Sequence, residues 1–216
     1  MALDPQSFRH MSLRQGSILG VPCRIARVSF TGELQFEISV RARFGASLWR
    51  RLLEAGQDIG IRPVGMEAWL RLRLEKGFIH IGTDTDGRTT PDDIGFGAMA
   101  ARKSADFLGK RSLSLPYMVS AGREQLVGLR TAGRSRIEVG GRIFAHGHAT
   151  PPAPTEGRVT SACFSPCVGG WIGLALLANG RARRGEKVMI HQSGQQIEAT
   201  VAAPVFYDPS GSRMQA

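Results

Sequence analysis

The sequence is poor in cysteine and contains no long apolar run. Its three cysteines, Cys23, Cys163 and Cys167, form no Cys-x-x-Cys pair, and their spacing does not suit a structural zinc site. Free thiols are typical of a reducing compartment, so we expect a cytoplasmic protein. The longest apolar segment, 171–178, has the length of a buried strand and is too short to span a bilayer, so no membrane partner is expected.

Motifs for nucleotide binding, covalent catalysis and metal binding are also missing. The sequence contains no G-x-G-x-x-G, P-loop or G-x-S-x-G motif, and no serine or cysteine has a recognisable His/Asp partner. His146-Gly147-His148 is a near pair without a third ligand. The acidic turn at 83–87 lacks the regular oxygen ligands and closing Glu of an EF-hand. We therefore predict no catalytic residue and no metal site.

Positive charge is abundant, with 28 Lys and Arg against 18 Asp and Glu, a formal charge of +10. Such a balance favours polyanions or small anionic ligands that carry carboxylates. The arginines are scattered, however, and the densest run, 181–184, is short. No zinc-finger spacing, aromatic RNA-binding signature or basic heptad region accompanies them. Nucleic acid is therefore not the expected partner.

The first half of the chain has an α+β pattern. Residues 33–40 alternate between apolar and polar side chains, which predicts a half-buried strand with Glu33 and Glu37 on its polar face. A solvated outer face is the ordinary interpretation of those carboxylates. Two further strands are expected within 17–30. Residues 1–16 carry no periodic pattern, although Phe8, Met11 and Leu13 could pack as a short extended piece.

Helices are expected at 44–55 and 66–76, each followed by a glycine. Arg73 falls on the apolar face of the second helix and needs a partner, because an unpaired buried guanidinium is costly. That partner could be Glu67, Glu75, a backbone carbonyl, a carboxylate across a site or a ligand. A helix start is expected at 90–93, and a short helix at 106–113.

The second half reads as an all-β domain. Short apolar segments punctuated by turns predict a small barrel or sandwich with strands at 125–129, 137–144, 159–164, 171–177, 187–191 and 196–202. We therefore divide the chain into an α+β domain, 1–117, and a β-barrel domain, 118–216.

Several motifs follow one another in a characteristic order. They are Val28-Ser29-Phe30-Thr31-Gly32-Glu33-Leu34 with Phe36-Glu37, Gly65-x-Glu67-Ala68 with Leu72-Arg73-Leu74-Glu75-Lys76-Gly77, Thr90-Pro91-Asp92-Asp93 and Asp106-Phe107-Leu108-Gly109-Lys110. This order resembles the aminomethyltransferase (glycine-cleavage T-protein) superfamily. The tail, with Gly157-x-Val159-Thr160-Ser161, Ser165-Pro166 and 204–209, narrows the resemblance to the C-terminal region of the α subunits of heterotetrameric sarcosine oxidases.

The resemblance implies a partial aminomethyltransferase-like α+β lobe followed by a small six-stranded β-barrel, around a tetrahydrofolate pocket. The implied role is capture of the one-carbon unit from oxidised sarcosine as 5,10-methylenetetrahydrofolate. The implied partners are the other sarcosine oxidase subunits, or the missing N-terminal part of the α subunit, which includes the family's proposed catalytic Asp. The chain is thus not expected to oxidise sarcosine alone. The alternative is a non-catalytic structural or assembly fragment of the same fold.

Three residues fall on folate-contacting positions of the family. Glu37 corresponds to the carboxylate that holds the pterin, Arg73 to a helix-borne arginine near the folate, and Tyr207 to a terminal aromatic contact. A pterin presents an N–H and an NH₂ group side by side, and one carboxylate can accept both, which suits Glu37. Glu33 is the rival. Arg73 could pair with Glu37 or hold the carboxylate of the folate.

Overall fold

The computed structural model describes residues 4, 7–147 and 154–215, which form two compact units. The first unit contains residues 1–73 and 208–216, and the second contains residues 74–207. No helix within the described ranges is long and apolar enough to cross a membrane. The fold class is α+β, as predicted.

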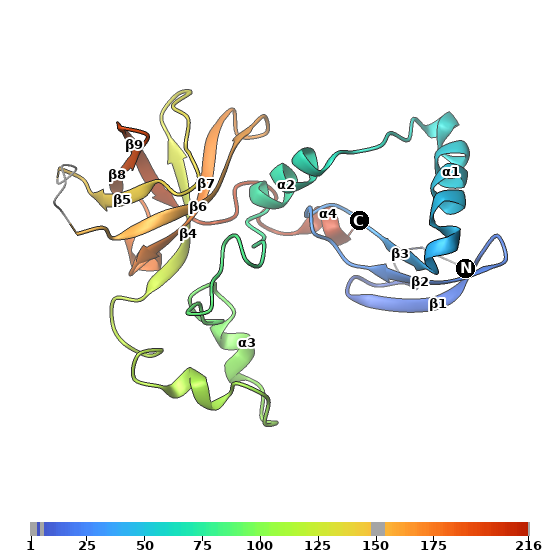
Figure 1. Ribbon diagram of the computed structural model, residues 1–216, viewed down its shortest axis with the longest axis horizontal. Helices are drawn as coiled ribbons and strands as arrows, with labels where there is room; N and C mark the ends of the chain where they lie inside the picture. Colours follow the sequence, from blue (N-terminus) through green and yellow to red (C-terminus); the bar gives the residue numbers. More distant parts are fainter. Residues whose placement is uncertain (1–3, 5–6, 148–153, 216) are drawn as a thin grey trace. The chain divides into compact units, whose positions relative to one another are not determined.

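The first unit is built on a three-stranded antiparallel sheet of β1 (Ser12–Ile18), β2 (Val21–Arg27) and β3 (Glu37–Val40), in that order (Figure 1). Leu19 and Gly20, with φ of 52° and 77°, form the two-residue turn between β1 and β2. Both residues need positive φ in such a turn, which matches the strand twist. One face of the sheet is buried around Phe8, Cys23 and Ile25.

Two strand predictions in this unit are wrong. The expected strand at 33–40 begins only at Glu37, because the preceding residues form a loop held by its own side chains. In that loop the Phe30 N–H donates to Gln35 Oε1 at 3.1 Å, and the Gly32 N–H donates to Ser29 Oγ at 2.9 Å. In addition, β1 begins at Ser12, inside the segment expected to lack a pattern. Pairing with β2 holds β1, since few of its side chains are apolar.

Both predicted helices are confirmed. After the 3₁₀ turn η1 (Ala42–Phe44), α1 runs over Gly45–Ala55, and after η2 (Gln57–Ile59), α2 runs over Met66–Glu75. Gly77, with φ of 71°, follows α2 in the left-handed conformation of a helix stop. The short helix α4 (Ser212–Gln215) returns the end of the chain to the first unit.

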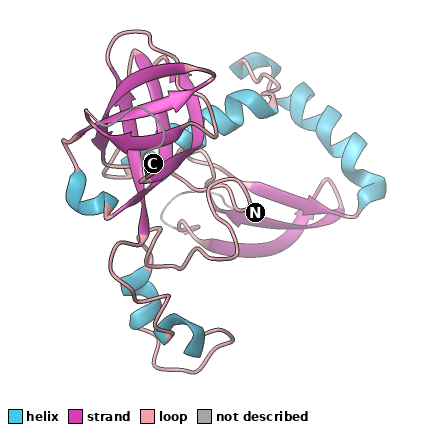
Figure 2. Cartoon of the chain, turned by 60° about the vertical axis from the view of Figure 1, so that its left-hand side comes forward, coloured by secondary structure: helices cyan, strands magenta, loops and turns pink. Residues whose placement is uncertain are grey.

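The second unit contains a closed six-stranded barrel with the strand order β4-β7-β6-β5-β8-β9. Figure 2 shows the strands in magenta. All six predicted segments contribute a strand. The strands are β4 (Glu124–Thr131), β5 (Arg142–Ala145), β6 (Gly157–Ser165), β7 (Gly170–Ala178), β8 (Lys187–Gln192) and β9 (Gln195–Ala202), with the 3₁₀ turn η4 (Gly180–Arg183) between β7 and β8. Pairing of β4 with β9 closes the barrel and leaves it without an edge.

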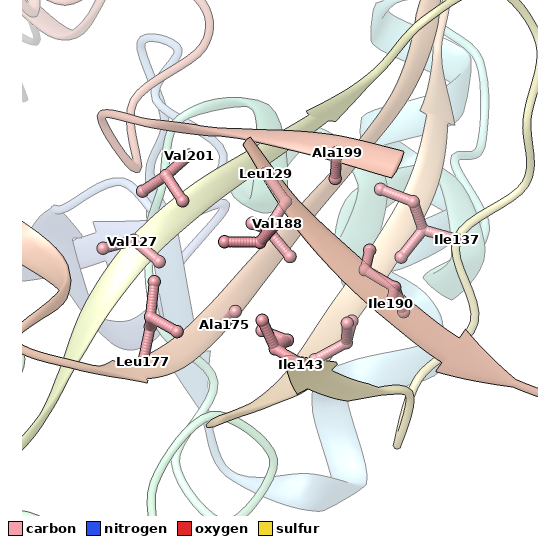
Figure 3. Close-up of a cluster of buried hydrophobic side chains, with 11 residues drawn as sticks. Val127, Leu129, Ile137, Ile143, Ala175, Leu177, Val188, Ile190, Ala199 and Val201 are labelled. Atoms are coloured by element: carbon pink, nitrogen blue, oxygen red, sulfur yellow. The ribbon is translucent and has the colours of Figure 1, made fainter. Parts of the chain in front are cut away.

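The barrel interior is a single apolar cluster (Figure 3). It contains Val127, Leu129, Ile137, Ile143, Val159, Ala175, Leu177, Val188, Ile190, Ala199 and Val201. Strand β7 is buried on its outer face too, where Ile172, Leu174 and Leu176 pack against Leu74 and Phe206. Burial on both faces explains why 171–178 reads as a continuous apolar run.

The segment between α2 and the barrel contains less helix than predicted. The Thr90 N–H donates to Asp93 Oδ2 at 2.7 Å and the Asp93 N–H donates to Thr90 Oγ1 at 3.3 Å, as at a helix start. Residues 91–95 nevertheless remain turns, and Gly95 has a φ of 89°. Only α3 (Gly97–Ala101) and η3 (Arg111–Ser114) follow, so the expected helix start at 90–93 and the expected helix at 106–113 are wrong.

Asp84 fastens the same segment to the barrel. Its side chain is fully buried, and its Oδ1 accepts hydrogen bonds from the hydroxyls of Thr160 at 2.5 Å and Ser161 at 2.6 Å on β6. Its Oδ2 accepts from the backbone N–H of His80 at 2.8 Å. The acidic turn that resembles part of a calcium loop therefore uses this aspartate as a structural anchor.

A second anchor is the ion pair of Asp93 with Arg123, whose side chains are 4% and 14% exposed. Burial by itself raises the pKa of Asp93, but the hydrogen bonds from Arg123 and Thr90 outweigh burial and hold that pKa below its ordinary value. A lowered carboxyl pKa adds stability at neutral pH that is lost as the pH falls through the folded-state pKa.

Arg123→Gln is therefore expected to lower the free energy of unfolding by about 2–3 kcal/mol at pH 7. The gap to wild type should narrow as the pH falls from about 5 toward 2, because Asp93 becomes protonated in both proteins. Urea unfolding at several pH values measures the gap, with the exposed Arg88→Gln as the control. A gap that is the same at every pH would contradict this role of the ion pair.

Candidate functional site

Glu37 lies at the start of the edge strand β3, on the open face of the sheet. It pairs in register with Ala26 of β2, and the strand alternates between exposed and half-buried positions. Ile38 and Val40 pack toward the core, so Glu37 and Ser39 face away from it. No side chain in the described part of the molecule pairs with the Glu37 carboxylate. This carboxylate is open to a ligand.

Glu33 has a different environment. Both of its carboxylate oxygens accept from Nε of Arg213, at 2.7 and 2.8 Å. The side chain lies in the loop before β3, so the prediction that it shares a strand face with Glu37 is wrong. The Glu33 carboxylate is thus paired with Arg213, whereas Glu37 has no such partner among the described side chains.

Aromatic stacking connects the loop before Glu37 to α2. The rings of Phe30 and Trp69 lie 3.9 Å apart at an angle of 22°. Arg73 follows Trp69 by one helical turn, on the same side of α2. Arg73 is 4% exposed, and Glu67, one of its possible partners, pairs with Arg71 at 3.5 Å. The buried guanidinium predicted for this helix is therefore present.

Tyr207 belongs to the second unit, whereas Glu37 and Arg73 belong to the first. Its backbone N–H donates to the carbonyl of Glu75 at 3.0 Å, beside a similar bond from Phe206 at 2.9 Å. A Cβ at Gly77 would lie 2.4 Å from the carbonyl oxygen of Pro204, so only glycine fits there. Tyr207 is 36% exposed.

A groove of about 390 Å³ lies at one end of the sheet that carries Glu37. Its lining includes two arginines that the sequence predictions missed, Arg24 on β2 and Arg41 just after β3. The missed signal is the period-two pattern itself. Continuing it past Ser39 puts Arg41 on the exposed face with Glu37, and the same alternation along β2 exposes Arg24.

Metal ligation finds no support in the described ranges, where no group of three or more His, Cys, Asp or Glu side chains is arranged to hold an ion. His146 Nε2 lies 2.9 Å from Glu198 Oε2, an exposed pair at the barrel surface. Its sequence neighbour His148 lies outside the described residues. Within the described residues, Cys23, Cys163 and Cys167 form no disulfide bond with one another.

Family comparisons agree with this architecture. Residues 1–104 match the model of the GCVT N-terminal domain, and residues 124–208 match the glycine cleavage T-protein C-terminal barrel domain. The glycine cleavage system aminomethyltransferase T from Bartonella henselae, a solved structure, covers 87% of this chain with a TM-score of 0.72 and 26% identity, over 50% of its own length. The chain belongs to the aminomethyltransferase (glycine cleavage T-protein) family.

Within that family the chain resembles sarcosine oxidase subunit alpha. The proteins of that name from Corynebacterium sp. (strain P-1) and Rhizobium meliloti (strain 1021) are both 39% identical to it, over 96% and 95% of this chain. The aminomethyltransferase of Halothermothrix orenii is 33% identical over 95% of this chain. The chain spans 22% and 21% of the two sarcosine oxidase subunits and 56% of that aminomethyltransferase.

Proposed function

We propose that the chain is a tetrahydrofolate-binding, aminomethyltransferase-like part of a sarcosine-oxidase-type complex. In this role it holds the folate on which the one-carbon unit from oxidised sarcosine is captured as 5,10-methylenetetrahydrofolate. Bound tetrahydrofolate supplies the two amine nitrogens that take up this unit. Family membership and the similarity to sarcosine oxidase α subunits support the proposal.

The single observation that carries it is the open carboxylate of Glu37. The neighbouring Glu33 is held by Arg213, whereas Glu37 has no such partner among the described side chains. An ionised carboxylate on a rigid strand can accept two parallel hydrogen bonds from the N–H and NH₂ of a pterin edge. The residues present thus fit the ligand of the family.

Arg73 and Tyr207 have supporting roles in the proposal. Arg73 is buried one turn beyond the Phe30–Trp69 stack, and in the proposal its guanidinium pairs with Glu37 or contacts the folate. Tyr207 presents a partly exposed aromatic ring, the kind of group that packs against a heteroaromatic ring. Its assignment rests on the family resemblance alone.

The proposed partners are the other oxidase subunits and the further polypeptide present in longer α subunits. In the first unit, α1 contains no buried residue. Large apolar side chains remain exposed on and after it, including Trp49 at 54%, Ile59 at 87% and Val64 at 66%. An exposed apolar surface of this kind is typical of a protein interface, which supports assembly into a larger complex.

Thermal unfolding with added tetrahydrofolate tests the proposal. A ligand at one hundred times its Kd stabilises the folded state by about 2.7 kcal/mol, which is a melting temperature increase of several degrees. No increase at saturating ligand would contradict folate binding. If the chain then still bound the other oxidase subunits, the structural or assembly role would be favoured instead.

A further inference from the structure

We propose that Arg24 and Arg41 form the subsite for the carboxylates at the glutamyl end of the folate. The proposal rests on the function proposed above, with the pterin at Glu37. The ligand is the tetrahydrofolate proposed above, which has a pterin at one end and two glutamyl carboxylates at the other. The evidence is the strand register, the backbone at Arg41, the groove and the distribution of charge.

Register puts Arg24 beside the pterin position. Arg24 pairs with Ser39, which follows Glu37 by two residues on β3. Residues two apart on a strand, and residues directly opposite on neighbouring strands, point to the same face. Glu37, Ser39 and Arg24 are all exposed, in agreement with that geometry. The guanidinium therefore shares the open face with the proposed pterin acceptor.

Arg41 extends the same row. Its backbone remains extended, with φ of −60° and ψ of 140°, before η1 begins. At a rise of about 3.3 Å per residue, its Cα lies about 13 Å along the chain from that of Glu37. That span, together with the length of an arginine side chain, suits an elongated ligand with a flat ring at one end and carboxylates at the other.

The groove brings the two arginines together. Arg24 and Arg41 both line the cavity of about 390 Å³, with Gln15 and Ser39 as further polar side chains. Gln15 pairs in register with Arg24, so three neighbouring strand positions contribute to one recess. A recess with two cations and two neutral hydrogen-bonding groups is complementary to carboxylates.

The positive charges of Arg24 and Arg41 lack the carboxylate partners that several other arginines of the chain have. Within the described residues, neither Arg24 nor Arg41 pairs with a carboxylate. Other arginines of the chain do so in the ion pairs Arg123–Asp93, Arg158–Glu124, Arg181–Asp92, Arg183–Glu156 and Arg213–Glu33. Two uncompensated cations in one groove repel each other and favour an anionic ligand.

This subsite also bears on the two roles considered for Arg73, which are pairing with Glu37 and binding the carboxylate of the folate. Arg73 is 4% exposed, whereas the glutamyl end of a folate is strongly hydrated and costly to bury. The exposed pair Arg24 and Arg41 can bind those carboxylates without removing them from water. Arg73 is thus assigned to the ring end of the ligand, near Glu37.

Calorimetric titration of the whole chain with two probes tests the subsite. Tetrahydrofolate carries the glutamyl carboxylates, and 6-methyltetrahydropterin carries the same ring without them. Arg24→Ala and Arg41→Ala should each weaken tetrahydrofolate binding about fivefold, and the double variant more than tenfold, at low salt. Affinity for 6-methyltetrahydropterin should stay within twofold of wild type. Arg50→Ala, an exposed arginine on α1, is the matched control and should change neither.

The outcomes separate this inference from the proposed function. If wild type binds tetrahydrofolate and Glu37→Gln does not, but the Arg24 and Arg41 variants bind like wild type, the subsite is wrong and the folate site stands. If the arginine variants lose both probes equally, the arginines support the fold rather than bind carboxylates, and the subsite is again wrong. If wild type binds neither probe, both proposals fail.

Discussion

Glu37→Gln is expected to weaken tetrahydrofolate binding by at least 30-fold, which corresponds to about 2 kcal/mol. The reason is chemical. A glutamine presents one acceptor and one donor group, so its NH₂ faces a donor of the pterin edge where the carboxylate accepted a hydrogen bond. The substitution should leave the fold intact, because Glu37 is exposed and forms no hydrogen bond or ion pair with a described side chain.

Glu33→Gln is the matched control for this prediction. Glu33 precedes Glu37 by four residues, but its carboxylate is held by Arg213, so we expect its variant to bind tetrahydrofolate within about threefold of wild type. Equilibrium titration of both variants, with melting temperatures to confirm folding, gives the comparison. Equal losses in both variants, or a larger loss for Glu33→Gln, would show that the pterin acceptor is wrongly assigned.

Asp84→Ala is expected to cost about 3–5 kcal/mol of unfolding free energy. The fully buried carboxylate accepts from the Thr160 and Ser161 hydroxyls and from the His80 N–H. Alanine would leave these donors without their buried acceptor and would release the segment after α2 from the barrel. A loss of this size is a large fraction of the stability of an ordinary domain.

Urea unfolding measures the effect, with Asp106→Ala as the control, because Asp106 is an exposed aspartate of the same unit. The control should change stability by less than about 0.5 kcal/mol. Removing both hydroxyls, through Thr160→Ala with Ser161→Ala, should make the further change Asp84→Ala much less costly, since the contacts are shared. A cost below 1 kcal/mol for Asp84→Ala alone would contradict the anchoring role.

The barrel could be predicted from sequence because its signals are local. Each of its strands is a short apolar or alternating segment between turns, and these segments meet in the closed order of the structure. The segment of β7 is continuously apolar and does not alternate, because β7 is buried on both faces. Helices α1 and α2 were predictable for the same reason, from apolar spacing and a following glycine.

The errors arise where polar side chains bind the backbone of a loop or a side chain that is distant in the sequence. The alternation at 33–36 suggested a strand, but hydrogen bonds that the Phe30 and Gly32 N–H groups donate to the side chains of Gln35 and Ser29 hold a loop instead. Thr90 and Asp93 form the reciprocal bonds of a helix start, yet Asp93 also binds Arg123, thirty residues later. No local pattern encodes such a contact, so a helix was expected where turns occur.

The candidate site was partly predictable. The family pattern and the chemistry of a pterin edge predict Glu37 as the pterin acceptor, and the helical spacing predicts Arg73 as a buried cation, which the structure confirms for its burial. The different environments of Glu33 and Glu37 could not be predicted from the local sequence. They depend on Arg213, which pairs with Glu33 and is 180 residues from it in the chain. The sequence predictions did not include Arg24 and Arg41 as candidate site residues. The strand pattern was used to locate the apolar face, and the charged residues on the exposed face were not considered.

The central claim is that Glu37 binds the N–H and NH₂ edge of a pterin, and calorimetric titration with a matched pair of ligands tests it most directly. The pair is 6-methyltetrahydropterin and the analogue in which the exocyclic NH₂ is replaced by oxygen. We predict that the wild-type chain binds the pterin at least 30-fold more tightly than the analogue, about 2 kcal/mol, and that Glu37→Gln loses this preference. Equal affinity of the wild-type chain for both ligands, or a preference that persists in Glu37→Gln, would contradict the account.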